Sequence, residues 1–110
     1  MTDPVIQEFS ARFLIGELII HKRFDYRGVI SDIDPVFNLS EEWYETVARS
    51  RPPKDQPWYQ VLVHQSGLLT YVAEQHLQSD PSDEAIQHPM ISEFFSGFHN
   101  GRYIQENPLH

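Results

Sequence analysis

The sequence predicts a mainly β fold with short helices, a small antiparallel β-barrel in a single domain. Three observations lead to this class. Short apolar segments alternate with polar residues and are bounded by turn residues. The length of 110 residues allows one modest core and no second one. A hydrophobic content of 40% and an aromatic content of 13% are typical of a folded globular chain.

The first predicted element is a β-hairpin. Residues 17–22 are short, β-branched and alternating, and residues 22–25 supply turn material. Residues 26–34 return as a second strand, which Pro35 ends. Gly28 in the middle of that strand predicts a β-bulge or a close approach of two backbones.

A short helix is predicted over residues 38–50. Asn38 or Ser40 can cap its N-terminus, and the two glutamates that follow suit the positive end of the helix dipole. Its apolar stripe has spacings of three and four residues and consists of Trp43, Tyr44, Val47 and Ala48. Two consecutive prolines, Pro52 and Pro53, prevent the helix from continuing.

A second hairpin follows. Residues 58–64 carry the strongest strand pattern, residues 65–68 form the turn, and residues 69–74 return. The polar stretch 78–87 is predicted to be a loop.

A last helix is predicted from Pro89 to Gly101. Its apolar residues fall at i, i+3, i+4 and i+7: Ile91, Phe94, Phe95 and Phe98. The domain organisation is then an N-terminal extension (1–11), a barrel domain (12–100) and a C-terminal tail (101–110).

The composition restricts the functional classes. There is no cysteine, so disulfides and thiolate metal sites are excluded, as fits a reducing cytosol. No apolar stretch approaches the roughly 20 residues that cross a bilayer. Residues 1–10 lack the order of charged and apolar residues that marks a secretory signal. We therefore expect a cytoplasmic protein without a membrane partner.

The net charge is −8, and its distribution argues against nucleic acid. Six of the eight basic residues lie in one stretch, balanced there by six acidic residues: Lys22, Arg23, Arg27, Arg49, Arg51 and Lys54. Outside that stretch, two arginines stand against ten acidic residues. An acidic surface favours protein partners over DNA.

Three segments resemble a known family. They are Gly16 to Pro35, the run Ser-Glu-Glu-Trp-Tyr-Glu at 40–45, and the run Arg-Pro-Pro-Lys-Asp-Gln-Pro-Trp-Tyr at 51–59. Together they are similar to the bacterial heat-shock HspQ family, also called YccV-like or hemimethylated-DNA-binding. The resemblance extends from about Arg12 to Arg102 and implies an SH3-like barrel.

The resemblance also implies a function. HspQ-like proteins are associated with the heat-shock response and with proteolysis by the ATP-dependent Lon protease, and they promote degradation of substrates that include the replication initiator DnaA. A homo-oligomer, with a trimer favoured, is implied as well. The family's other name implies binding of hemimethylated DNA.

The residues themselves offer no enzyme motif. A glycine-rich phosphate loop, a nucleophile elbow and a His-Glu-x-x-His motif are all missing from the sequence. The six histidines never fall at spacings of three or four residues, although His21 and His64 would converge if their strands paired. We expect no catalytic residue, no metal site and no cofactor.

Two basic clusters are the candidate nucleic-acid or partner contacts. Lys22, Arg23 and Arg27 lie at the first hairpin, next to Phe24 and Tyr26, and such pairs of cations and aromatics can hold phosphates and bases. The second cluster follows the first helix and contains Arg49, Arg51 and Lys54. The favoured interpretations are a solvated hairpin tip for the first cluster and helix-dipole complementation for the second.

The stripe Ile91, Phe94, Phe95 and Phe98 is the candidate protein interface. Large apolar patches on small proteins tend to mark interfaces. Packing within the chain is the other interpretation and the favoured one, because aromatic residues dominate small cores.

The sequence and the resemblance together lead to one functional hypothesis and one alternative. The first is a non-enzymatic stress-response factor that promotes degradation of certain denatured or regulatory proteins by Lon, as an adaptor or specificity enhancer. The alternative is a hemimethylated-DNA-binding protein that uses the hairpin tip and the basic loop after the helix.

Overall fold

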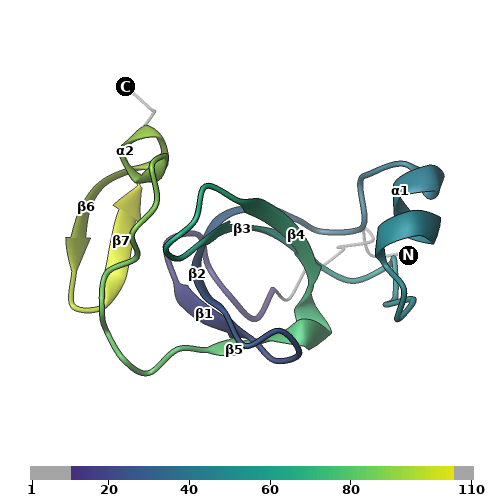
Figure 1. The fold of residues 1–110 in the computed structure, drawn as a ribbon, viewed down its shortest axis with the longest axis horizontal. Coiled ribbons are helices and arrows are strands. Elements are labelled where there is room, and N and C mark those ends of the chain that lie inside the picture. Colours follow the sequence, from purple (N-terminus) through teal and green to yellow (C-terminus); the bar gives the residue numbers. More distant parts are fainter. Residues whose placement is uncertain (1–10, 106–110) are drawn as a thin grey trace, which may run out of the picture.

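The structure is a computed structural model that describes residues 11–105. Five strands form one antiparallel sheet of order β4-β3-β2-β1-β5. Its strands are β1 (Leu18–His21), β2 (Arg27–Asp34), β3 (Trp58–Val63), β4 (Leu69–Ala73) and β5 (Leu77–Ser79). Figure 1 shows the sheet curled around a central core, with α1 (Glu41–Val47) at one end of the molecule and a separate hairpin at the other. Both predicted β-hairpins of this sheet are confirmed.

The sheet is not closed into a barrel. Its outer strands, β4 and β5, are joined by the 3-10 turn η1 (Glu74–His76), but they do not pair with each other over residues 11–105. All three residues of β5 pair with β1. The predicted class, mainly β and antiparallel with short helices, is confirmed, whereas barrel closure is not found.

Strand β5 lies partly in the stretch predicted to be a loop. Leu77 is fully buried, while Gln78 and Ser79 are exposed. Because Leu77 is the one apolar residue of this three-residue strand, the sequence shows no alternation of apolar and polar residues that would predict it.

The predicted last helix is wrong. Only one helical turn forms, α2 (Ile91–Phe94), and the chain then builds a hairpin from β6 (Phe95–His99) and β7 (Arg102–Gln105). Asn100 and Gly101 both have positive φ, 51° and 74°, and Asn-Gly is the preferred sequence of a two-residue hairpin turn. Residues 102–105 of the predicted tail therefore form a strand, and residues 106–110 lie outside the described residues.

The strands β1, β2 and β3 are buried on both faces. The inside of the curl holds Phe13, Ile19, Ile30, Tyr59, Val61, Val72 and Leu77. The outside packs against the C-terminal hairpin through Leu18, Val29, Leu62, Ile86, Phe95 and Tyr103. Gly28 is the close approach that the sequence predicts, since a Cβ there would lie 2.5 Å from Val61 Cγ1. The bulge itself occurs between Ile30 and Asp32.

Helix α1 is shorter than predicted and anchors an aromatic cluster. Ser40 is its N-cap, accepting a hydrogen bond of 3.0 Å from the backbone N–H of Trp43. Tyr44 packs with Trp58 beneath the helix, and Phe37, Trp43 and Tyr71 surround them. Val47, predicted to belong to the apolar stripe, is 54% exposed.

Candidate functional site: a groove along strand β4

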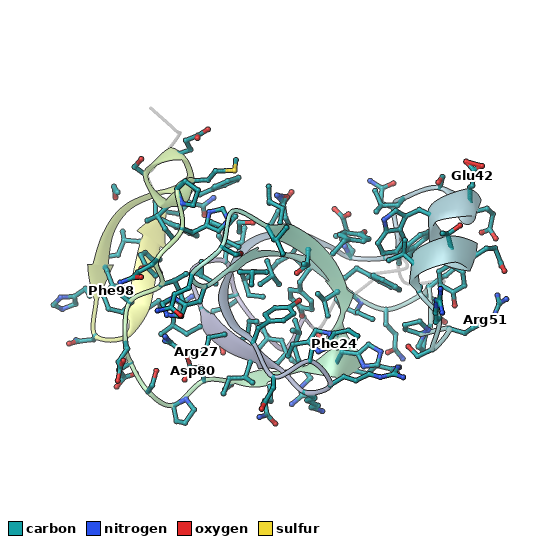
Figure 2. The ribbon with its side chains drawn as sticks, in the orientation of Figure 1. Phe24, Arg27, Glu42, Arg51, Asp80 and Phe98 are labelled. Atoms are coloured by element: carbon teal, nitrogen blue, oxygen red, sulfur yellow. The ribbon has the colours of Figure 1, made fainter. Side chains whose placement is uncertain are left out.

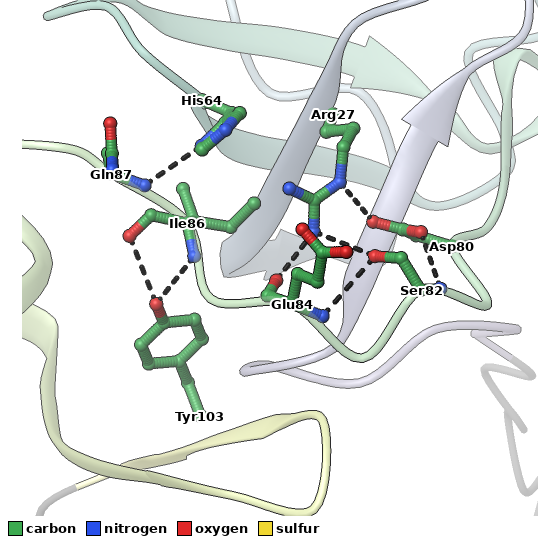
Figure 3. A network of polar contacts seen from close by, with 8 residues as sticks. All are labelled: Arg27, His64, Asp80, Ser82, Glu84, Ile86, Gln87 and Tyr103. Carbon is green, nitrogen blue, oxygen red and sulfur yellow. Dashed lines mark hydrogen bonds and ion pairs between the residues drawn. The ribbon is translucent and has the colours of Figure 1, made fainter.

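Arg27 is a structural residue rather than a free cation. Its Nε lies 2.6 Å from Oδ2 of Asp80, whose side chain is only 2% exposed. The same guanidinium donates to Ser82 Oγ and to the Glu84 carbonyl, which fastens the segment after β5 to the sheet (Figure 3). Burial raises the pKa of Asp80, but hydrogen bonds from Ser82 and Arg27 outweigh it and hold that pKa below its ordinary value.

Two further predicted cations are paired with carboxylates of α1. Arg51 makes a bidentate pair with Glu45, at 2.7 and 2.8 Å. Lys54 pairs with Glu41 and lies over the ring of Tyr44, 4.3 Å from its centroid. Three of the six predicted contact residues are thus engaged within the chain.

The other three predicted cations, Lys22, Arg23 and Arg49, are exposed. Within residues 11–105, none of them forms an ion pair. Arg23 and Arg49 border the same groove, whereas Lys22 does not. The structure therefore brings together one residue from each of the two predicted clusters.

The groove has a volume of about 870 Å³ and lies between the first hairpin tip, strand β4 and helix α1; we call it the β4 groove. Its exposed apolar surface comes from Phe24, Leu39, Val47 and Leu69. Phe24 is 69% exposed, the highest value among the large hydrophobic residues of the described chain. Figure 2 shows Phe24 on the side of the sheet that faces α1.

Polar contacts hold the walls of the groove together. The Tyr26 and Thr70 hydroxyls are 2.7 Å apart and join the hairpin to β4. The Tyr71 hydroxyl donates to Asp34 at 2.6 Å, so the carboxylate on the groove wall is already hydrogen-bonded. Sequence patterns reveal neither contact, because 44 and 37 residues separate the partners.

His21 stabilises the hairpin tip. Its Nδ1 accepts hydrogen bonds of 3.1 Å from the backbone N–H groups of Arg23 and Phe24. Its ring stacks on His76, with 5.7 Å between centroids, rather than meeting His64, whose Nδ1 accepts from the Gln87 N–H. Burial, with the charges of His76 and Arg23, lowers the pKa of His21 to about 4.

This geometry predicts acid sensitivity of the fold. Between the ordinary pKa of 6.5 and the folded pKa of about 4, unfolded His21 binds a proton that the folded state does not. Stability therefore rises with pH in that window and falls on acidification. The pKa values of His64 and His76 are lowered too, mainly by burial, and act in the same direction. We expect the free energy of unfolding to drop by about 2 kcal/mol between about pH 7 and about pH 4.5, measured by urea unfolding.

The matched variant is His21→Asn, whose side-chain oxygen can accept the same N–H bonds without titrating. It should flatten the pH dependence, while His99→Asn, at an exposed position on β6, should keep it. An unchanged slope in His21→Asn would assign the acid sensitivity to other groups.

The predicted interface residues lie far from the groove. Ile91, Phe94 and Phe98 pack against the cluster that contains Leu18, and Phe95 is buried, with its ring 5.1 Å from that of Tyr103. Figure 2 shows Phe98 at the opposite end of the molecule from α1.

The described part of the chain contains neither a cluster of metal-binding side chains nor a helix that could span a membrane. Among residues 11–105, no three histidine, aspartate or glutamate side chains converge as a metal site would require. Over the same residues, no helix has the length and apolar character needed to cross a membrane.

Fold and groove together define a small antiparallel β protein with a partly apolar groove at one sheet edge. Residues 11–102 match the family described as hemimethylated DNA-binding protein YccV like. The chain belongs to this YccV-like family, the one that its sequence motifs resemble.

Proposed function

We propose that this protein is a non-enzymatic stress-response factor of the cytoplasm that promotes degradation of certain denatured or regulatory proteins by Lon. It acts by binding a protein chain, as an adaptor or specificity enhancer. The observation that supports the proposal is the β4 groove, which leaves the apolar side chains of Phe24, Leu39, Val47 and Leu69 exposed. Exposed apolar surface of this kind marks contacts with other proteins.

Reconstituted proteolysis tests the proposal. Purified Lon, ATP and a chemically denatured substrate or DnaA are incubated with and without the full chain. We expect the chain to raise the initial rate of substrate loss several-fold. The variant Phe24→Asp, at the groove, should lose this effect, and Leu68→Asp, at another exposed apolar position outside the groove, should keep it. A degradation rate that the wild-type chain leaves unchanged would contradict the proposal.

DNA binding remains the second candidate because Arg23 and Arg49 border a groove that is also lined by aromatic side chains. Charge weighs against it. Three of the six candidate cations are neutralised by Asp80, Glu45 and Glu41, in a chain of net charge −8. Three remaining cations would give a salt slope of only about −3 for log K against log[salt].

We therefore expect no binding of a hemimethylated duplex at physiological salt in a fluorescence-anisotropy titration. A fully methylated duplex of the same sequence is the control for methylation-specific recognition. Tight binding that discriminates between the two duplexes and is lost in Arg23→Glu would make DNA the ligand of this site.

A further inference from the structure

The β4 groove follows the edge of a strand. All five residues of β4, from Leu69 to Ala73, border it. Successive side chains of a strand point to opposite faces, so five consecutive residues can border one groove only where the strand's edge faces it. Strand β4 is also the last strand of the sheet, with β3 on one side and no strand on the other within residues 11–105.

The hydrogen-bond pattern between β3 and β4 shows which backbone groups of β4 face the groove. The Val63 N–H donates to the Leu68 carbonyl, and the Glu74 N–H donates to the Pro57 carbonyl. Hydrogen-bonded pairs alternate along an antiparallel ladder, so Thr70 and Val72 bond to β3. The N–H and C=O groups of Leu69, Tyr71 and Ala73 therefore point away from β3. An edge of this kind is a template for an extended peptide.

The side chains that border the groove indicate which side chains a bound peptide would have. Phe24 and Val47 present apolar surface, 69% and 54% exposed, on the hairpin tip and on α1. Arg23 and Arg49 add two positive charges and outnumber the one bordering carboxylate, Asp34, which accepts a hydrogen bond from the Tyr71 hydroxyl. The groove is thus a local positive site on an acidic protein and complements a carboxylate.

We propose that the β4 groove binds an extended peptide segment of a partner protein as an additional strand on β4. The segment places a large apolar side chain against Phe24 and Val47 and a carboxylate beside Arg23 and Arg49. Main-chain hydrogen bonds supply affinity, and these two side chains supply selectivity. The inference deepens the proposed function by stating which feature of a client or protease chain the adaptor recognises, and it rests on that function.

The test uses the full chain and a fluorescein-labelled eight-residue peptide, in which one aspartate stands two residues from one phenylalanine in a threonine-rich background, so that both side chains lie on one face of the added strand. Anisotropy titrations compare it with the same peptide carrying lysine for aspartate or serine for phenylalanine. Each change should weaken binding about 10-fold. Equal affinity of all three peptides would overturn the assigned selectivity.

Protein variants locate the site. Arg23→Glu should weaken binding about 10-fold, whereas Lys22→Glu, its exposed neighbour outside the groove, should leave it within twofold. Phe24→Ser should have a similar effect, with Leu68→Ser as its matched control. Losses of the same size in the variants and their controls would contradict a groove site.

The backbone mode has its own readout. Two peptides are compared, one N-methylated at the odd-numbered amides and the other at the even-numbered amides. Only the peptide whose methylated amides would face β4 should lose binding. In the protein, the amides of Leu69 and Tyr71 should gain protection from hydrogen exchange when peptide is added. Equal binding of both methylated peptides would overturn strand addition.

Other occupants are also tested. Competition of the peptide by a single-stranded oligonucleotide, in a salt-sensitive manner, would reassign the groove to nucleic acid. Concentration-dependent dimers that Phe24→Ser abolishes would reassign it to a second copy of the chain. Failure here is distinguishable from failure of the proposed function, because stimulation of Lon without peptide binding refutes only this inference. Peptide binding without stimulation refutes only the adaptor function.

Discussion

Arg27→Ala should lower the free energy of unfolding by about 3 kcal/mol, because it leaves a buried carboxylate without its cation. The Asp80 side chain is 2% exposed and that of Arg27 is 22% exposed, so water compensates little for the lost pair. The variant also removes the contacts to Ser82 and Glu84 that hold the segment after β5. Urea unfolding monitored by tryptophan fluorescence measures the change.

The matched control is Arg51→Ala. Its pair with Glu45 has the better bidentate geometry, but the side chains are 61% and 51% exposed. Exposed pairs contribute little, so the unfolding midpoint should stay at the wild-type value. The double variant Arg27→Met with Asp80→Leu should recover most of the stability, since apolar replacement of both partners removes the buried charge. If Arg27→Ala kept the unfolding midpoint of the wild type, the ion pair between Arg27 and Asp80 would not contribute to stability.

Gly16→Ala should destabilise the fold by about 3 kcal/mol, for two separate reasons. Gly16 has φ of 94°, a conformation that an alanine adopts only with strain. A Cβ there would also collide with the backbone carbonyl of Tyr103, whose N–H donates to the Gly16 carbonyl at 2.9 Å. The substitution therefore separates the C-terminal hairpin from the sheet.

Gly67→Ala is the control, since a Cβ at Gly67 meets nothing within 4 Å and its φ is not in the left-handed region. It should change the unfolding midpoint little. In Gly16→Ala, the amides of β7 should lose protection from hydrogen exchange before those of β3 do. Uniform loss of protection, or none, would show that Gly16 does not fasten the hairpin.

The central sheet could be predicted from the sequence because its strands carry their own signals. The segment from Trp58 to Val63 is rich in aromatic and β-branched residues, and the turn that follows contains Gly67. Ser40 likewise indicates the start of α1, because its side chain caps the helix by accepting a hydrogen bond from the N–H of Trp43, three residues later. Each of these features depends on neighbours within a few residues.

The segment of the C-terminal hairpin carries two conflicting local signals, one for a helix and one for a hairpin turn. Phe94, Phe95 and Phe98 have helical spacing, yet the Asn-Gly pair at 100–101 is a strong hairpin signal. Tertiary packing decides the outcome: Phe95 and Tyr103 lie on opposite strands and bury their rings against each other. A helix would have separated them.

The groove and the state of the cations could not be predicted. Arg27 and Asp80 are 53 residues apart, and Arg23 and Arg49 border one groove only because the hairpin tip and the end of α1 converge. Sequence patterns therefore identified six candidate cations but could not separate those engaged in ion pairs from those that border the groove.

The most direct measurement of the central claim is a side-by-side binding experiment on one preparation of the full chain. Surface-immobilised protein is exposed to purified Lon and, separately, to a hemimethylated duplex at physiological salt. We predict capture of Lon that Phe24→Asp weakens, with no DNA signal. Salt-sensitive DNA binding that Arg23→Glu abolishes, without any capture of Lon, would contradict a protein-binding adaptor.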